Sequence, residues 1–591
     1  MRRRLPLRAV LVLAMLLLAG CATLDEPADR AGTQAPIEGK TRVRGYLETR
    51  DGTLLAYDAY VPGDGSGRWP TLLTYDGYAA GSSVDAGYVE RYVPQGYAVV
   101  GVSVRGTGCS GGTFDFFEPA QALDGYDAVE WAAAQPWSDG RVGMVGKSFP
   151  GITQLFVAAQ RPPHLVAAAP GHVFGDVYRD VAYPGGVFNY AFAALWSFVA
   201  QPAPGTQAAL RETAAGDEVC ARHVAERQAE NARLHPFVQA QQHPFDDPFL
   251  RERSPLHVAD RVEVPLYLLQ SWQDEQVGVR GVAVAERVAG PVFLTVSNGD
   301  HAMYRTEASL ARLDRFFERY VKGVENGFER EPRVVVWWDA GADGTRGPSW
   351  QTTHDAWPPR NVEPVELRLR AGGRLLPERA TGPEEPGRYV YPAGTTSNGA
   401  GYGYPWPAAQ TTDRLAPPPP TRLVYETEPL ARDLVVLGAA NLTLRLASTA
   451  TDTDVQATLS EARPDGRVVF VQKGWLRASH RALDGANSTP YRPFHPHDEA
   501  VPLRPGEAAE LNVEILPFGH AFRAGSRIQL AIEAPQVPPE LWGFAPAPLP
   551  AVNAVLHDAD HDSFLRLPTL TGVAVPGALP PCGALIRQSC R

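Results

Sequence analysis

The chain has 591 residues, of which 44% are hydrophobic and 20% are charged, and its formal net charge is −11. Because one hydrophobic core rarely grows beyond roughly 300 residues, the chain is long enough for more than one domain. The acidic balance argues against a nucleic-acid binder, which would normally carry a basic surface.

The first segment has the pattern of a lipoprotein signal peptide. Arginines precede the apolar run AVLVLAMLLLAG, which is too short to cross a bilayer as an ordinary helix. The ending LLAGC resembles a bacterial lipobox, which implies removal of residues 1–20 and attachment of lipid to Cys21. We therefore expect a lipid-anchored protein of the bacterial cell envelope. Ala22, rather than aspartate, follows the cysteine, which favours sorting to the outer membrane. Residues 21–40 have the composition of a flexible tether.

Residues 41–165 have the pattern of a mostly parallel sheet covered by helices. Apolar runs of strand length occur at residues 69–78 and 96–108, and each ends in glycine or polar residues. After the second of these runs, the stretch ALDGYDAVEWAAAQ has the apolar spacing of a helix. Strands that alternate with helices in this way are typical of an α/β fold.

A serine between two glycines follows the next strand. The stretch RVGMVG predicts a buried strand and ITQLFVAAQ a helix, so Ser148 is expected on the turn between them. Gly146 and Gly151 would allow a tight bend that exposes the serine hydroxyl. The spacing Gly-x-Ser-x-x-Gly is one residue longer than the commonest nucleophile elbow. The motif alone is therefore equally compatible with an ordinary loop serine.

The α/β pattern is interrupted and then resumes. Residues 166–261 contain YAFAALWSFVA and EVCARHVAERQAENARLH, whose spacing is helical, and they predict a helical cap over the sheet. Residues 262–329 resume the α/β pattern, because VPLYLLQSWQD and GPVFLTVSNGDH are typical of buried strands that end at polar loops.

From about residue 330 the chain changes character. Pro and Gly punctuate short alternating stretches such as RVVVWWDAG, VELRLRAGG, ANLTLRLAST and RIQLAIEAP. This pattern predicts a separate antiparallel domain, a jelly-roll β-sandwich, over residues 330–575, followed by a tail at 576–591.

Four cysteines follow Cys21 in the sequence. Cys109 and Cys220 are expected to be free and buried, which is the commoner state of isolated cysteines. Whether Cys582 and Cys590 close a disulfide loop in the tail is left open by the sequence.

A serine hydroxyl is a weak nucleophile that needs a base, an acid to orient the base, and donors for the oxyanion. In sheets of this kind the chain order is nucleophile, acid, base. Ser148, Asp274 and His301 follow that order, and each comes at a strand end. Glu275 stays open as an alternative acid. Asp300 is poorly placed, because the side chains of adjacent residues diverge.

Several longer segments resemble one family of hydrolases. They are RGTGCSGGTF, DGYDAVEWAAAQPWSDGRVGMVGKSFPG, SWQDEQVG, NGDH, WPP at residues 357–359 and GHAFRAGSRIQL. Over residues 41–575 the chain resembles the cocaine esterases, α-amino acid ester hydrolases, glutaryl acylases and X-prolyl dipeptidyl peptidases. The resemblance implies an α/β-hydrolase core, a helical cap and a carboxyl-terminal jelly roll.

The resemblance also implies roles for individual residues. Ser148 would be the nucleophile, Asp274 the acid and His301 the base. A tyrosine in the turn after an early strand would donate its hydroxyl to the oxyanion together with the backbone amide of Phe149. Tyr75 is the preferred tyrosine, and Tyr78 is a less favoured substitute.

These features predict a serine hydrolase that cleaves small-molecule esters or amides through an acyl-enzyme. Two alternatives are an X-prolyl dipeptidyl peptidase and a surface-binding lipoprotein with an inert hydrolase core. No cofactor, metal or nucleic-acid partner is predicted. The Gly-x-Gly-x-x-Gly at residues 106–111 is not followed by a convincing helix start, which a dinucleotide site would require.

Overall fold

The computed structural model describes residues 39–341, 346–391, 421–535 and 542–590. The predicted signal peptide, Cys21 and nearly all of the predicted tether lie outside the described residues. Among the described residues, no helix has both the length and the apolar character needed to cross a membrane.

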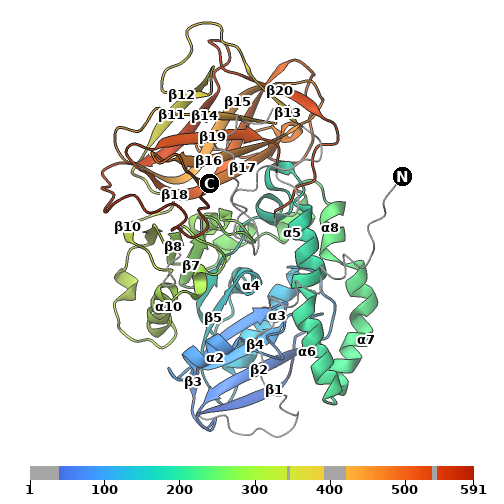
Figure 1. The fold of residues 1–591 in the computed structure, drawn as a ribbon. Helices are drawn as coiled ribbons and strands as arrows, with labels where there is room; N and C mark the ends of the chain where they lie inside the picture. Colours follow the sequence, from blue (N-terminus) through green and yellow to red (C-terminus); the bar gives the residue numbers. More distant parts are fainter. Residues whose placement is uncertain (1–38, 342–345, 392–420, 536–541, 591) are drawn as a thin grey trace.

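A ten-stranded sheet forms the first layer of the molecule (Figure 1). Its strand order is β1-β2-β4-β3-β5-β6-β7-β8-β9-β10. In this order, each pair of neighbouring strands between β4 and β9 is parallel. The strands are β1 Lys40–Glu48, β2 Leu54–Pro62, β3 Trp69–Asp76, β4 Ala98–Ser103, β5 Ser138–Lys147, β6 Leu165–Gly171, β7 Leu266–Ser271, β8 Val292–Ser297, β9 Val334–Trp338 and β10 Trp350–His354.

Helices cover both faces of this sheet, because its central strands are apolar on both sides. The helices α3 (Pro119–Ala133) and α4 (Phe149–Ala158) pack on one face, where residues such as Val129 and Leu155 join the main core. The helices α2 (Ala86–Tyr92) and α10 (Glu307–Tyr320) pack on the other face.

The segment between β6 and β7 is helical, as predicted, and forms the cap beside the sheet (Figure 1). The cap begins later than residue 166, because β6 continues to Gly171. Its helices are η1 Tyr178–Ala182, η2 Pro184–Gly186, α5 Tyr190–Leu195, η3 Trp196–Ala200, α6 Pro202–Ala214, α7 Glu218–Arg233, α8 Pro236–Gln242, α9 Pro248–Glu252, η4 Pro255–His257 and η5 Ala259–Arg261. Further short helices lie in the core at η6 Arg280–Glu286, η7 Met303–Arg305 and η8 Phe328–Arg330.

The hydrolase sheet continues beyond the predicted boundary at residue 330. The strand β9 pairs in parallel with β8, and β10 pairs with β9, so RVVVWWDAG belongs to the hydrolase sheet. The β-sandwich begins at β11. Its strands are β11 Val362–Arg370, β12 Arg374–Leu376, β13 Gly387–Tyr391, β14 Arg422–Glu426, β15 Leu434–Ser448, β16 Asp454–Ala462, β17 Val468–Arg477, β18 Ala508–Phe522, β19 Arg527–Glu533, β20 Ala551–Leu556 and β21 Phe564–Leu570, with one short helix, η10, at Ala478–His480.

The prediction of free cysteines is also wrong. Cys109 and Cys220 form a disulfide that joins the glycine-rich loop after β4 to helix α7 of the cap. The same loop is held by Arg227 of α7, which donates to the carbonyl oxygens of Gly108 and Ser110. The glycine-rich loop is therefore a docking site for the cap.

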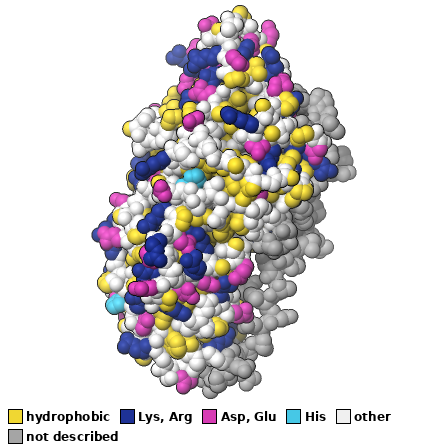
Figure 2. Space-filling model, turned by 90° about the vertical axis from the view of Figure 1, so that its left-hand side faces the viewer, with side chains coloured by type: hydrophobic (Ala, Val, Ile, Leu, Met, Phe, Trp, Pro, Cys, Tyr) yellow, Lys and Arg dark blue, Asp and Glu magenta, His cyan; other side chains and the backbone are white. Residues whose placement is uncertain are grey.

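The face of the molecule in Figure 2 carries Lys and Arg side chains interspersed with Asp and Glu side chains. Charges of both signs lie over the hydrolase core and over the sandwich in this view.

Candidate active site

Ser148 lies at the sharp turn where β5 ends and α4 begins. Its backbone has φ 62° and ψ −133°, and its side chain does not cap the helix. The turn is too tight for larger neighbours, since a Cβ on Gly146 would lie 2.8 Å from Pro150 and one on Gly151 would lie 2.7 Å from the carbonyl oxygen of Gly171. The glycines therefore permit the bend that leaves the serine partly exposed, as the sequence pattern predicts.

His301 and Asp274 meet in the loops that follow β8 and β7. The Nδ1 of His301 lies 2.9 Å from Oδ2 and 3.1 Å from Oδ1 of Asp274. Asp274 is fully buried, and its Oδ1 also accepts the backbone N–H groups of Gln276 and Val277. These bonds hold the carboxylate in place against the imidazole.

The other carboxylates of these loops have different partners. Glu275 accepts the backbone N–H of His301 at 3.1 Å. Asp300 lies beside the guanidinium groups of Arg346 and Arg587. Of the acids that the sequence left open, Asp274 is the one that contacts the imidazole ring.

The elbow and the histidine loop are joined by Lys147. Its Nζ donates to the carbonyl oxygen of His301 at 2.7 Å. Burial lowers the pKa of Lys147 to about 8. Burial likewise lowers the pKa of His301, and the charge of Lys147 adds to this effect, so the imidazole is neutral near pH 7. A neutral imidazole is the form that can accept a proton.

Tyr75 does not take the position expected of an oxyanion donor. It is fully buried on β3 and packs against α3, where a Cβ on Gly125 would lie 3.1 Å from its ring. Its hydroxyl has no hydrogen-bond partner among the described residues. Alternation along the strand points this side chain to the face of the sheet that α3 covers.

Tyr78, in the loop after β3, lies beside the nucleophile instead. Burial raises its pKa to about 12, and a hydrogen bond with Ser148 opposes that rise. The indole Nε1 of Trp196 donates to its hydroxyl oxygen at 3.3 Å. The ring of Tyr78 also contacts Phe149, the first residue of α4. The backbone amide of Phe149 has no partner within the helix, because the first N–H groups of a helix have none.

One neighbour of the site had no sequence motif to reveal it. His172 follows β6, is fully buried, and its ring centroid lies 5.2 Å from that of His301. Its Nε2 lies 2.9 Å from the Ser271 hydroxyl. Its position directly after a buried strand, at the same sheet edge as Ser148, was the available signal.

Ligand atoms of His172, Asp274 and His301 lie within 4.8 Å of one another, close enough to hold a metal ion. The carboxylate of Asp274 is already hydrogen-bonded to the imidazole of His301. The three side chains thus form one buried polar cluster at the carboxyl ends of β6, β7 and β8.

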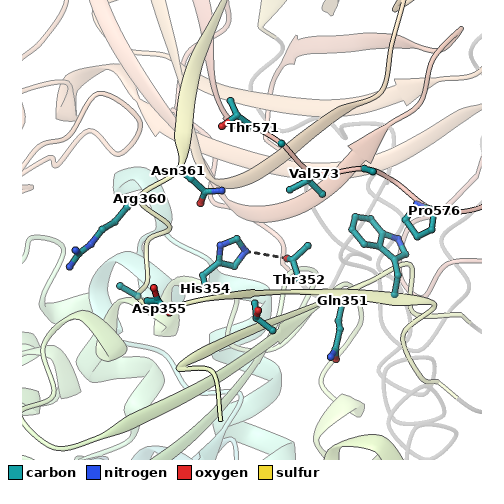
Figure 3. Close-up of a pocket in the computed structure, with 14 residues that line it drawn as sticks. Gln351, Thr352, His354, Asp355, Arg360, Asn361, Thr571, Val573 and Pro576 are labelled. Carbon is teal, nitrogen blue, oxygen red and sulfur yellow. Dashed lines mark hydrogen bonds between the residues drawn. The ribbon is translucent and has the colours of Figure 1, made fainter. Parts of the chain in front are cut away.

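A separate pocket of about 810 Å³ lies between β10 and the loop after β21 (Figure 3). His354 and Thr352 face each other in it, with Nε2 and Oγ1 3.1 Å apart. Its lining includes none of the site residues predicted from the sequence.

Comparisons with known proteins match both halves of the chain. A family model described as X-Pro dipeptidyl-peptidase (S15 family) matches residues 51–303, and the X-Pro dipeptidyl-peptidase C-terminal non-catalytic domain matches residues 326–565. The chain is 28% identical to the cocaine esterase of Rhodococcus sp. over 538 residues, which cover 83% of this chain and 90% of that protein.

Solved structures also share the fold. A CocE/NonD family hydrolase from Staphylococcus aureus superposes with a TM-score of 0.74 at 23% identity, covering 90% of this chain and 94% of that chain. An α-amino acid ester hydrolase superposes with a TM-score of 0.69 at 19% identity, covering 93% of this chain and 100% of that chain.

Proposed function

Since the chain belongs to the serine hydrolase family that includes cocaine esterase and the X-Pro dipeptidyl-peptidases, we propose that it cleaves small-molecule esters through an acyl-enzyme on Ser148. The observation that carries this proposal is the buried Asp274–His301 pair at the same sheet edge as a serine with φ 62°. Strained backbone of this kind at a strand-to-helix turn is typical of nucleophile elbows.

The proposed reaction has two steps. In the first, Oγ of Ser148 attacks the ester carbonyl while His301 takes the hydroxyl proton. The tetrahedral intermediate collapses, and His301 returns this proton to the departing alcohol. In the second, His301 takes a proton from water, the hydroxide attacks the acyl group, and the acid is released as Ser148 regains its proton.

Charge develops on the carbonyl oxygen in both steps. We assign the Tyr78 hydroxyl and the Phe149 amide as its donors. The position of Tyr78 supports this assignment, because its oxygen already accepts from Trp196 and its own proton is left to donate. Tyr78 thus replaces Tyr75, which the sequence favoured.

The cap supports an uncharged substrate. An X-prolyl peptidase must bind a free ammonium, and an unpaired buried ammonium is costly. Four carboxylates of the cap have partners of their own. Asp176 pairs with Arg179, Asp180 accepts backbone N–H groups, Glu212 pairs with Arg44, and Asp217 caps α7.

An aromatic wall lies next to the nucleophile. The ring of Trp196 stacks on Phe149 at a centroid distance of 6.2 Å, and Phe149 stacks on Phe117 at 4.5 Å. Such a wall suits an aromatic or acyl group without charge.

We therefore expect larger kcat/KM values for phenyl and alkyl esters of small acids than for Gly-Pro and Ala-Pro anilides. The measurement is a parallel screen of chromogenic esters and X-prolyl anilides with purified protein. Larger values for the anilides would assign the chain to the peptidase alternative. A protein that cleaves neither class and resists a fluorophosphonate probe would support the binding-lipoprotein alternative.

We also propose that the mature chain is tethered to the outer membrane by lipid on Cys21. The support is the basic and apolar leader that precedes this cysteine. Cys21→Ser should lower the share of protein that sediments with membranes and enters detergent. Unchanged partition of the Cys21→Ser protein would contradict the lipid anchor.

A further inference from the structure

The carboxyl-terminal segment packs between the hydrolase core and the sandwich. Cys582 and Cys590 form a disulfide that closes residues 582–590 into a loop, here called the tail knuckle. Leu585 forms an isolated backbone β-bridge with Gly341, just beyond β9. Cys590 forms another with Val469 on β17. The knuckle therefore contacts β17 of the sandwich and the loop that follows β9 of the hydrolase sheet.

Arg587 extends from the knuckle toward the loops after β7 and β8, which carry Asp274 and His301 and are here called the catalytic loops. Its Nη2 lies 3.6 Å from Oε1 of Glu275, and its Nε lies 3.4 Å from Oδ2 of Asp300. Glu275 directly follows Asp274, and Asp300 directly precedes His301. One guanidinium thus links the loop that carries the acid to the loop that carries the base.

The backbone of His301 is reached through the same contacts. Glu275 accepts the His301 N–H through Oε2 while its Oε1 faces Arg587. Nearby, the Asn298 side chain donates to the carbonyl oxygens of Ala340 and Ile586, which ties the base loop to the knuckle. Displacing the knuckle would remove support from both ends of the loop that holds His301.

The imidazole of His301 is surrounded by charges from several elements. Facing it or its neighbours are Lys147 at the end of β5, His172 after β6, Asp274 and Glu275 after β7, Asp300 and Arg305 in its own loop, Arg346 after β9, and Arg587. Glu275 is nearly fully buried, and Arg587 is the cation within ion-pair distance of it among the described residues. Without this cation, the carboxylates beside His301 would be less compensated.

We propose that Arg587 is a positioning residue for the catalytic base, and that the Cys582–Cys590 disulfide holds it in place, so that an intact tail knuckle is required for full hydrolase activity. This proposal rests on the proposed function of Ser148, Asp274 and His301. It assigns a positioning role to a segment far from the nucleophile in sequence.

The first test compares Arg587→Gln with Arg587→Lys across the pH range. Arg587→Gln should lower kcat by about tenfold or more with little change in KM, because a displaced base slows the chemical step. In the pH profile of kcat for Arg587→Gln, the fall at low pH should begin at a higher pH than in the parent (the acid limb). The reason is that carboxylates without a compensating cation favour the protonated form of the His301 imidazole. Arg587→Lys should restore most of the activity and the original acid limb.

Arg523→Gln is the matched control. Arg523 also holds the tail, by donating to the carbonyl oxygen of Gly577, and it pairs with Asp433 rather than with a catalytic-loop acid. We expect Arg523→Gln to leave kcat and the pH profile unchanged. An Arg587→Gln protein with the parent rate and parent acid limb would overturn the proposal, as would equal loss in Arg523→Gln.

The second test removes the disulfide. Cys582 and Cys590 are partly exposed, whereas Cys109 and Cys220 are buried, so mild reduction should open the knuckle first. The reduced protein and the Cys582→Ser/Cys590→Ser protein should both show the slower rate and shifted acid limb. Parent behaviour in both, with thiols counted to verify reduction, would contradict the role of the disulfide.

Failure of this proposal is distinguishable from failure of the proposed function. Fluorophosphonate labelling and Ser148→Ala test the nucleophile in the parent chain. If the parent hydrolyses esters through Ser148 but ignores changes at Arg587, only the positioning role is lost. Thermal unfolding of each variant identifies any loss caused by misfolding.

Discussion

Ser148→Ala is expected to lower kcat/KM for ester substrates by a factor of about 10⁴ to 10⁶. The loss is large because Ser148 is the proposed covalent nucleophile, and without its hydroxyl no acyl-enzyme forms. The fold should be unaffected, since the side chain is partly exposed and does not cap α4. Initial rates with a chromogenic ester, together with fluorophosphonate labelling, measure the effect.

Ser66→Ala is the control for this substitution. Ser66 is an exposed serine in the turn between β2 and β3. The Ser66→Ala protein should hydrolyse the ester at the parent rate and be labelled by the fluorophosphonate probe as the parent is. A Ser148→Ala protein that retained most of its activity would show that another group is the nucleophile.

Tyr78→Phe is expected to lower kcat by a factor of about 10² to 10³, with a smaller change in KM. The hydroxyl would stabilise charge that appears only in the tetrahedral intermediate, so its loss falls on the chemical step. Tyr78 lies against Ser148 and Phe149, where the carbonyl oxygen of a bound ester is expected. Steady-state kinetics with one ester give both constants.

Tyr75→Phe is the matched control, because it removes the same atom from the tyrosine that the sequence favoured. The Tyr75 hydroxyl is buried without a hydrogen-bond partner among the described residues. Its removal should leave the rate within about twofold of the parent, because no contact to the reacting atoms is lost. The opposite order of effects would restore Tyr75 as the oxyanion donor.

The elbow was predictable because its requirements are local. A buried strand, a helix and two small residues around Ser148 are all contiguous in sequence, and each imposes a backbone preference on its own neighbours. The positions of Asp274 and His301 followed from a simple rule, since parallel strands bring their carboxyl ends to one edge. The α/β-hydrolase core, the helical cap and the jelly roll were likewise predicted correctly.

To choose between Tyr75 and Tyr78 as the oxyanion donor, one must know the residue at which β3 ends. Tyr75 still belongs to the strand, where alternation turns it toward α3, while Tyr78 lies beyond the strand in the loop near Ser148. The Asp76–Gly77 dipeptide is a turn signal at this strand end, but it does not show which of the two tyrosines lies near Ser148.

The sheet to which β9 belongs could not be predicted for a related reason. Alternating stretches such as RVVVWWDAG predict strands but not the sheet that they join. The strand β9 pairs with β8 in the hydrolase sheet, and that choice is made by the neighbouring strand rather than by β9 itself.

By itself, the sequence determined the fold class, the hydrolase family and the residues proposed as nucleophile, acid and base, because these depend on local periodicity and on the order of strand ends. Only the tertiary structure decided the Cys109–Cys220 pairing, the position of Tyr78 and the contact of Arg587 with the catalytic loops. Each of these is a contact between distant or differently oriented segments. Such contacts are set by how the sheets, cap and tail pack together, and no local pattern encodes them.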